Sequence, residues 1–373
     1  MQAFVGAQVF DGVSLHRDAV LLVQGDRVAG LGPSVPPGAE VVNVPGGILA
    51  PGFVDLQVNG GGGVMVGAAT DSGQLAQICA VHGRLGAMGV LPTLITDRPE
   101  VTARVLDAGI EAQDEPGFLG LHLEGPHLDP RRKGAHDAAL IRPMTSEDLA
   151  LYVQAAQQLP ALMITLAPAS AKADQVAALV AAGVVVSLGH AEATAADAQA
   201  LIAAGAQSAT HLFNAMSQLQ GRAPGLVGAV LSSDIAAGLI ADGLHVDWDS
   251  IKIACAARPE GLFLVSDCMA VAGTDLTEFD LAGRRILRRE GRLTLEDGTL
   301  AGADLSLAQA VGNMVRHAGL GVERALAMAT SIPARVIGRP DLGHLRPGAV
   351  ADLVHLTDAF TLAATWRGGE RLV

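Results

Sequence analysis

Aromatic side chains are scarce in this sequence: Phe, Trp and Tyr make up 3% of the 373 residues, although 50% of the residues are hydrophobic. The apolar content is therefore carried by small aliphatic residues. Such side chains suit closely packed layers of helices and strands better than the aromatic surfaces on which proteins stack nucleic-acid bases. A chain of this length buries roughly 75% of the surface that it exposes when unfolded, so a large core is available.

Positive charge is also in short supply, because 25 Lys and Arg residues face 38 Asp and Glu residues and leave a net charge of −13. This acidic balance argues against nucleic acid as a partner. A phosphorylated small molecule stays compatible with it if one local pocket reverses the sign of the charge.

Cysteines are few and scattered, at Cys79, Cys255 and Cys268. They are too far apart in the sequence for a disulfide framework or a Cys-type zinc site. The first ten residues lack the basic start and long apolar run of a signal peptide, and Gly, Asp or Gln interrupts every longer apolar stretch. We therefore expect a cytoplasmic protein without a membrane-spanning helix.

Both ends of the chain show short apolar runs between turn signals, as in Asp11-Gly12, Pro36-Pro37-Gly38 and Arg367-Gly368-Gly369. This spacing is typical of small antiparallel strands. We expect residues 1–50 and 345–373 to form one small β domain from both termini.

The middle of the chain, residues 51–344, alternates between strand-like apolar runs and helical segments rich in Ala and Leu, such as residues 146–158 and 194–204. Strand–helix alternation predicts a parallel sheet, and eight strands over about 290 residues favour a closed (β/α)8 barrel of the TIM type. We expect the long stretch 214–234 to be a loop. The eight strand-like runs are residues 53–57, 90–95, 119–124, 162–167, 184–188, 208–211, 237–242 and 262–267.

Four of these runs end in, or within two residues of, a side chain that can bind a metal or transfer a proton: Glu124, His190, His211 and Asp267. In a barrel the carboxyl ends of all strands meet at one mouth, where the chemistry of such enzymes takes place. Two imidazoles and one carboxylate with an open position form a catalytic metal site that activates water. We expect Asp267 to take the proton of that water and to pass it to a leaving nitrogen.

Each of these residues also has a plainer interpretation. A single histidine at a strand end can be a packed structural residue, and Asp267 can cap a loop. His122 lies two residues before Glu124, so both side chains point to the same face of a strand; we expect it to support the ligands or to pack rather than to bind the metal. The remaining histidines with no polar companions are interpreted as surface or structural residues: His16, His82, His317, His344 and His355.

Seven segments, in this order and spacing, resemble the N-acetylglucosamine-6-phosphate deacetylase family of the amidohydrolase superfamily. The resemblance covers nearly the whole chain. The segments are PGFVDLQVNG (51–60), HLEGP (122–126), KGAH (133–136), SLGH (187–190), THLFNAM (210–216), PGLVG (224–228) and DGLHVD (242–247).

The resemblance implies a metal-dependent barrel enzyme with a small β-sandwich domain formed by both termini. It implies that the enzyme hydrolyses the N-acetyl group of N-acetylglucosamine-6-phosphate, giving glucosamine-6-phosphate and acetate in amino-sugar catabolism. It implies that Glu124, His190 and His211 bind the metal and that Asp267 is the general acid and base. It also implies a homodimer in which an arginine reaches the neighbouring subunit's phosphate site. The substrate contacts that it implies are His136, Asn214, Ala215, Arg222, His245, Leu300, Ala301 and Gly302.

Arg222 suits this role physically, because a dianionic phosphate in an acidic protein needs a local cation, and a guanidinium offers a fixed fork of donors. It can equally be a solvated loop charge. Ala223 stands where relatives often carry Glu, which puts the neighbouring loop contact in question, and Cys268 follows Asp267 where Ala is usual. We expect Cys268 to be a packed side chain rather than a ligand.

One metal ion is expected rather than two. Many superfamily members carry a His-x-His pair after the first strand, but Gln57 and Asn59 occupy those positions here. None of the three lysines ends a predicted strand, so a bridging carboxylated lysine, and with it a ring-opening activity, is not expected. We expect Zn²⁺, with Fe²⁺ or Co²⁺ as alternatives for the same ligands. A deacetylase for N-acetylgalactosamine-6-phosphate or for an N-acyl-D-amino acid, and an inert barrel scaffold, stay open as alternatives.

Overall fold

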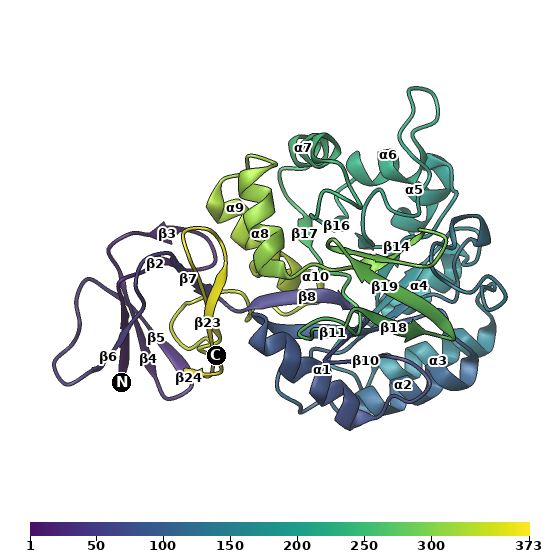
Figure 1. Ribbon diagram of the computed structural model, residues 1–373. Coiled ribbons are helices and arrows are strands. Elements are labelled where there is room, and N and C mark those ends of the chain that lie inside the picture. Colours follow the sequence, from purple (N-terminus) through teal and green to yellow (C-terminus); the bar gives the residue numbers. More distant parts are fainter.

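Eight parallel strands form the largest sheet of the computed structural model, which describes all 373 residues (Figure 1). Each strand pairs with the next one in the chain. The backbone N–H of Asp267 donates to the carbonyl of Gln57 at 3.1 Å, and that of Asn59 donates to the carbonyl of Cys268 at 3.0 Å, which joins the last strand to the first. The predicted (β/α)8 barrel is confirmed. Its strands are β8 (Phe53–Val58), β11 (Ala87–Ile95), β12 (Leu121–Glu124), β13 (Leu162–Leu166), β14 (Val185–Leu188), β15 (Ser208–Ala209), β16 (Ala236–Leu239) and β17 (Leu262–Leu264).

The barrel strands are buried on both faces, because side chains fill the interior and helices cover the outside. A single cluster of 83 buried hydrophobic residues runs through the barrel and its helices. This explains why the strands appear in the sequence as continuous apolar runs instead of alternating patterns. Some buried polar residues lie within the strands, among them Asp55, His122 and Thr165, and those at the carboxyl ends mark the mouth of the barrel.

Helices between the strands close the outer layer, and none of them has the length and hydropathy needed to cross a bilayer. The helix expected from residue 194 begins as predicted: Thr194 caps it and forms a reciprocal capping box with Asp197. The helices are α1 (Ser72–Arg84), α2 (Pro99–Glu111), η1 (Pro130–Arg132), α3 (Ser146–Ala156), α4 (Ala173–Ala181), α5 (Ala195–Ala203), α6 (Gly225–Leu231), α7 (Trp248–Ala257), α8 (Leu307–Arg316), α9 (Val322–Ala329) and α10 (Ser331–Val336).

Helix α6 corrects the expectation that residues 214–234 are all loop. Helix α6 itself contains two glycines and no polar residue, so neither helix propensity nor amphipathic periodicity indicates a helix there. Six of its seven residues are buried. Packing against the barrel therefore decides its conformation.

An inserted four-stranded sheet, absent from our sequence-based prediction, follows the last barrel strand. Its strands are β18 (Glu278–Leu281), β19 (Arg284–Arg289), β20 (Arg292–Thr294) and β21 (Leu300–Ala303). A separate cluster of six buried residues, including Met269 from the barrel and Ile286 from β19, holds this sheet against the barrel. The two-residue turn between β18 and β19, Ala282-Gly283, has φ values of +51° and +79°, which fit a tight hairpin.

The two ends of the chain form a β-sandwich beside the barrel, seen at the left of Figure 1 with both termini. A core of 13 buried residues lies between a four-stranded and a six-stranded sheet, and Phe4 packs edge-on against Trp366 with ring centroids 5.4 Å apart. The strands are not all antiparallel as expected, because β1 pairs in parallel with β6 and β2 with β7. In each of these pairs, four other strands lie between the two partners in the chain. The sandwich strands are β1 (Gln2–Val5), β2 (Gln8–Phe10), β3 (Leu15–His16), β4 (Val20–Gln24), β5 (Arg27–Gly32), β6 (Glu40–Asn43), β7 (Ile48–Pro51), β22 (Leu353–Leu356), β23 (Leu362–Arg367) and β24 (Glu370–Arg371).

Candidate metal centre

Glu124, His190 and His211 meet at the mouth of the barrel from three different strands. Glu124 is the last residue of β12, and the two histidines lie two residues beyond β14 and β15. His190 and His211 adopt left-handed backbone conformations with φ of +45° and +32°, as Asp267 does with +48°. Non-glycine residues adopt this region rarely, and such strain concentrates at functional sites. Here it turns the side chains inward at the point where each strand ends.

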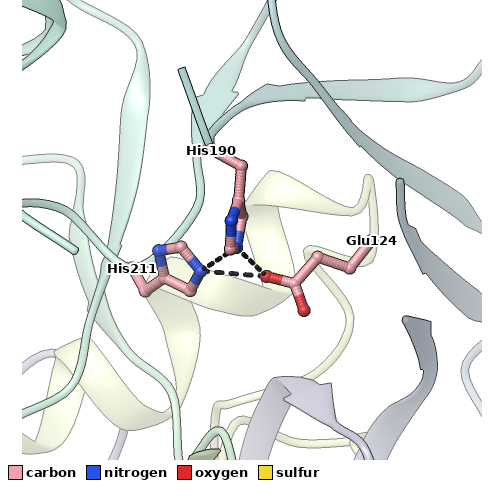
Figure 2. Close-up of side chains that lie close together, drawn as sticks. All are labelled: Glu124, His190 and His211. Atoms are coloured by element: carbon pink, nitrogen blue, oxygen red, sulfur yellow. Dashed lines mark hydrogen bonds and ion pairs between the residues drawn. The ribbon is translucent and has the colours of Figure 1, made fainter. Parts of the chain in front are cut away.

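The three side chains converge on one point, as Figure 2 shows. Glu124 Oε1 lies 3.1 Å from His190 Nε2 and 2.9 Å from His211 Nε2, and the two Nε2 atoms are 3.0 Å apart. All three residues are buried. No side chain lies between the two imidazole nitrogens and the carboxylate oxygen. Their separations are close to those between atoms that bind the same metal ion.

The tautomer of His190 and the low pKa of Glu124 suit metal binding, because both leave lone pairs available at the centre. His190 Nδ1 lies 2.8 Å from the carbonyl oxygen of Arg132, which accepts its hydrogen and leaves the Nε2 lone pair directed at the centre. Burial acts to raise the pKa of Glu124, but hydrogen bonds and positive charge from the two histidines hold it well below its usual range. Burial likewise acts to lower the pKa of His211, but Glu124 raises it.

A divalent metal ion fits this donor set. In a tetrahedral site with metal–ligand distances of about 2.0–2.1 Å, ligand atoms lie roughly 3.3–3.4 Å apart. The three observed separations, between 2.9 and 3.1 Å, need an expansion of only a few tenths of an ångström. His₂Glu is a donor set that suits zinc, iron and cobalt alike, so these atoms define a site without selecting its metal.

Asp267 lies beside the three ligands and is held by two amides from β8 and the residue after it. Its Oδ1 accepts from Asn59 Nδ2 at 2.7 Å and from Gln57 Nε2 at 3.1 Å. Gln57 Nε2 also lies 3.2 Å from Glu124 Oε1, so it bridges the two carboxylates. Burial, followed by the charge of Glu124, raises the pKa of Asp267 to about 6. With Oδ1 fixed, Oδ2 is the oxygen that can accept a proton.

His136 presents a neutral N–H donor to the same space. The backbone N–H of Thr96 donates to His136 Nδ1 at 3.3 Å, which places the ring hydrogen on Nε2. His136 Nε2 lies 3.8 Å from Glu124 Oε2. Burial lowers the pKa of His136 to about 3, so the ring stays uncharged at neutral pH.

A cavity of about 260 Å³ opens in front of these residues. Of the residues implied as substrate contacts, His136, Asn214, Ala215, His245, Leu300 and Gly302 line it. Ala301 does not line the cavity and packs instead in the small cluster under the inserted sheet. Arg222 is exposed on the loop before α6 and does not line the cavity of its own chain.

The remaining histidines lie outside the cavity. His122 is buried within the barrel, and its Nε2 lies 2.7 Å from Thr165 Oγ1. His82 lies under the site, with Nε2 2.9 Å from the Gly60 carbonyl oxygen and 3.5 Å from the buried thiol of Cys268. His16 differs from our interpretation, because Asp11 is a polar companion at 2.7 Å.

Sequence reasoning missed the roles of Gln57, Asn59 and Thr96. The first two were noted only as replacements for a histidine pair. Their amides form the hydrogen bonds that hold Asp267, and no local pattern predicts such contacts between β8 and the end of β17. His127, buried and bonded to the Tyr152 hydroxyl at 3.0 Å, was also not singled out.

The fold and the site together define a barrel that gathers two histidines and two acidic residues at the carboxyl ends of its strands, an arrangement typical of metal-dependent hydrolases. Comparison with known proteins narrows this class. The model of the amidohydrolase family matches residues 48–372. The chain belongs to this family.

Relatives along nearly the whole chain are sugar-phosphate deacetylases. The chain is 41% identical over 330 residues to an N-acetylgalactosamine-6-phosphate deacetylase of Shewanella sp. (strain ANA-3), covering 87% of this chain and 83% of the relative. It is 31% identical over 376 residues to the N-acetylglucosamine-6-phosphate deacetylase of Haemophilus influenzae, covering 99% and 98%. The crystal structure of the N-acetylglucosamine-6-phosphate deacetylase from Pasteurella multocida superimposes with a TM-score of 0.95 at 35% identity, covering 100% and 99%.

Proposed function

We propose that this protein hydrolyses the N-acetyl group of N-acetylglucosamine-6-phosphate to glucosamine-6-phosphate and acetate, as a metal-dependent step of amino-sugar catabolism. The observation that carries this proposal is the convergence of Glu124, His190 and His211 next to Asp267 in one cavity. The similarity to full-length deacetylases supplies the substrate class.

Glu124, His190 and His211 would hold one divalent cation, Zn²⁺ first and Fe²⁺ or Co²⁺ as alternatives. When bound, such a cation lowers the pKa of water towards about 7 and polarises a carbonyl oxygen. The protein's own residues handle the protons. Asp267 Oδ2 accepts a proton from the attacking water and then donates it to the nitrogen as the C–N bond breaks, so that the product leaves as a neutral amine.

His136 assists at the carbonyl. Its Nε2–H faces the cavity, and because the ring is neutral it donates a hydrogen bond to the oxygen on which negative charge develops. Gln57 and Asn59 keep Asp267 oriented through their bonds to Oδ1. Asn214, Ala215 and His245, together with Leu300 and Gly302, would contact the sugar and its phosphate.

The phosphate site also involves the second subunit in this proposal. The protein acts as a homodimer in which Arg222, on an exposed loop, contributes to the phosphate site of its neighbour. The absence of any Lys or Arg among the residues that line the cavity supports a cation from elsewhere. We further propose that the chain works in the cytoplasm, in keeping with its three free cysteines.

We propose that the two structural units divide near residues 50 and 345, with residues 1–50 and 345–373 in the sandwich and residues 51–344 in the barrel. Leu345 packs in the sandwich core, and Phe53 packs in the barrel core. The metal ligands and Asp267 all come from the barrel part.

A second candidate substrate is N-acetylgalactosamine-6-phosphate. The relative from Shewanella is named for this epimer, and its 41% identity to this chain supports the second candidate. The same metal ligands and Asp267 would serve both substrates, because the two sugars differ only in the configuration at C4, whereas the reacting amide is on C2.

Acetate release from the two phosphorylated sugars and from unphosphorylated N-acetylglucosamine tests the function. We expect turnover of at least one phosphorylated sugar, its loss on treatment with a chelator, and its return with zinc. No acetate release from either phosphorylated sugar by metal-loaded protein would refute the proposal. The ratio of kcat/KM for the two epimers assigns the substrate.

A further inference from the structure

The cavity that would receive a phosphorylated substrate has no cationic side chain in its own lining, yet one of its walls carries an arginine-rich strand. Five arginines lie within residues 284–292, in a protein with a net charge of −13. This segment belongs to the inserted sheet, whose residues Leu281, Thr299 and Leu300 line the cavity. We therefore asked which of these arginines faces the site.

Strand alternation answers this question. Ile286 is buried in the cluster between the inserted sheet and the barrel, so Arg284 and Arg288, at even spacing from it, share its inward face. Arg285 and Arg289 are exposed on the other face. Of these four arginines, only Arg284 and Arg288 are therefore on the face of the strand that is directed toward the mouth of the barrel.

The inward arginines differ in their partners. Arg288 forms a two-pronged ion pair with Asp304 at 2.8 and 2.9 Å, and the outward Arg285 is paired with Glu278. Arg284 makes no side-chain hydrogen bond or ion pair within the chain, although it is half-buried. A half-buried guanidinium without a counter-charge is available for an anionic ligand.

The register of the hairpin places Arg284 at the cavity. Arg284 is the direct cross-strand partner of Leu281, and cross-strand partners carry their side chains on the same face with Cβ atoms about 4.5–5.5 Å apart. Leu281 lines the cavity. The tight Ala282-Gly283 turn fixes this register, so Arg284 lies directly opposite a residue of the cavity wall, although it is not itself part of the lining.

We propose that Arg284 is an in-chain binding residue for the phosphate group of the substrate. This inference rests on the proposed function, and it adds a cation from the same subunit to the one expected from the neighbour. Burial is the main reason that the pKa of His136 falls to about 3; the charges of His190 and His211 lower it further, and the charge of Arg284 contributes least.

Arg284→Met tests the proposal because it keeps the apolar stem next to Leu281 and removes the charge. In metal-loaded protein we expect kcat/KM for the phosphorylated sugar to fall about 10- to 100-fold, the range for a lost charge-assisted hydrogen bond, mainly through KM. We expect kcat/KM for unphosphorylated N-acetylglucosamine to stay within about twofold. Arg284→Lys should recover part of the loss.

Arg289→Met is the matched control, since it removes the same charge from the outward face of the same strand. We expect it to behave as the unmodified protein with both sugars. An unchanged KM in Arg284→Met, or equal losses on the phosphorylated and unphosphorylated sugars, would overturn the proposal. Equal losses would mean that Arg284 only supports the inserted sheet.

Calorimetry with inorganic phosphate separates this proposal from the proposed function. If the unmodified protein releases no acetate but binds phosphate at least tenfold more tightly than Arg284→Met does, the function fails and the phosphate site stands. If both bind phosphate equally, or neither binds it, the role of Arg284 is refuted whatever the enzyme does.

Discussion

At the scale of single residues, the site depends on amides as much as on the acid–base groups. Asn59 and Gln57 both donate to Oδ1 of Asp267, and Gln57 also reaches Glu124. These contacts favour the ionised form of Asp267, whereas burial favours the protonated form. Their balance leaves a carboxyl group with a pKa of about 6, which suits proton transfer near neutral pH.

Replacing Asp267 with Asn should leave the fold and the metal site intact but remove the proton carrier. We expect kcat to fall by a factor of about 10² to 10⁴. Metal content, measured by atomic emission on protein purified without added metal, should equal that of the unmodified protein. A kcat close to that of the unmodified protein would contradict the role of Asp267 as the proton carrier. Loss of the metal would contradict the view that Asp267 is not one of the metal ligands.

The raised pKa of Asp267 also predicts the direction of the pH dependence. The base acts in its ionised form, so kcat/KM should rise with pH and level off above a pKa of about 6. A bound cation lowers this pKa by favouring the carboxylate, so the midpoint in metal-loaded enzyme should lie at or below 6. A pH–rate profile between pH 4.5 and 8 measures it, and a midpoint above 7 would be incompatible with this role.

At the scale of elements, the inserted sheet covers the mouth of the barrel but shares little of its core. Its own cluster holds six buried residues, whereas the barrel cluster holds 83. Ile286 is completely buried in the small cluster. The sheet can therefore loosen without unfolding the barrel, and its residues at the cavity depend on this limited packing.

Ile286→Ala should detach the inserted sheet locally. Removing a buried isoleucine costs about 2–5 kcal/mol at the site. We expect faster proteolysis within residues 278–303 and a raised KM, with little change in the midpoint of global thermal unfolding. Leu276→Ala, at a side chain that is 42% exposed just before the sheet, is the control and should change none of these. A large drop in the global midpoint would show that the sheet unfolds together with the barrel.

At the scale of the whole molecule, Arg222 lies on an exposed loop outside the cavity of its own chain, which accords with a role in a neighbouring subunit. Mixed dimers test this role. Arg222→Ala subunits keep Asp267, and Asp267→Asn subunits keep Arg222, so one site of each mixed dimer regains both groups.

We expect co-expressed subunits of these two variants to show more activity at low substrate concentration than either variant does by itself. Light scattering should give twice the mass of one chain for all three samples. A monomeric mass, or a mixture no more active than the sum of its parts, would refute the shared site.

Individual residues show how far the sequence can be interpreted. Glu124, His190, His211 and Asp267 stood out because each interrupts an apolar run at its end, and the structure brings all four to one mouth. Helix α5 was predictable because Thr194 and Asp197 form a local capping box. Helix α6, by contrast, lacks any local signal, and the inserted sheet was not recognised among the turns after residue 267.

The order of strands and helices, the apolar character of each barrel strand and the residue types at the strand ends are local properties, so the sequence by itself determined them. The direction of each side chain was decided only by the tertiary structure: the left-handed turns at His190, His211 and Asp267, the amide contacts from Gln57 and Asn59, and the inward face of Arg284. These depend on contacts between segments as much as 210 residues apart. Closing the barrel brings such segments together, and no pattern within one segment encodes the position of the other.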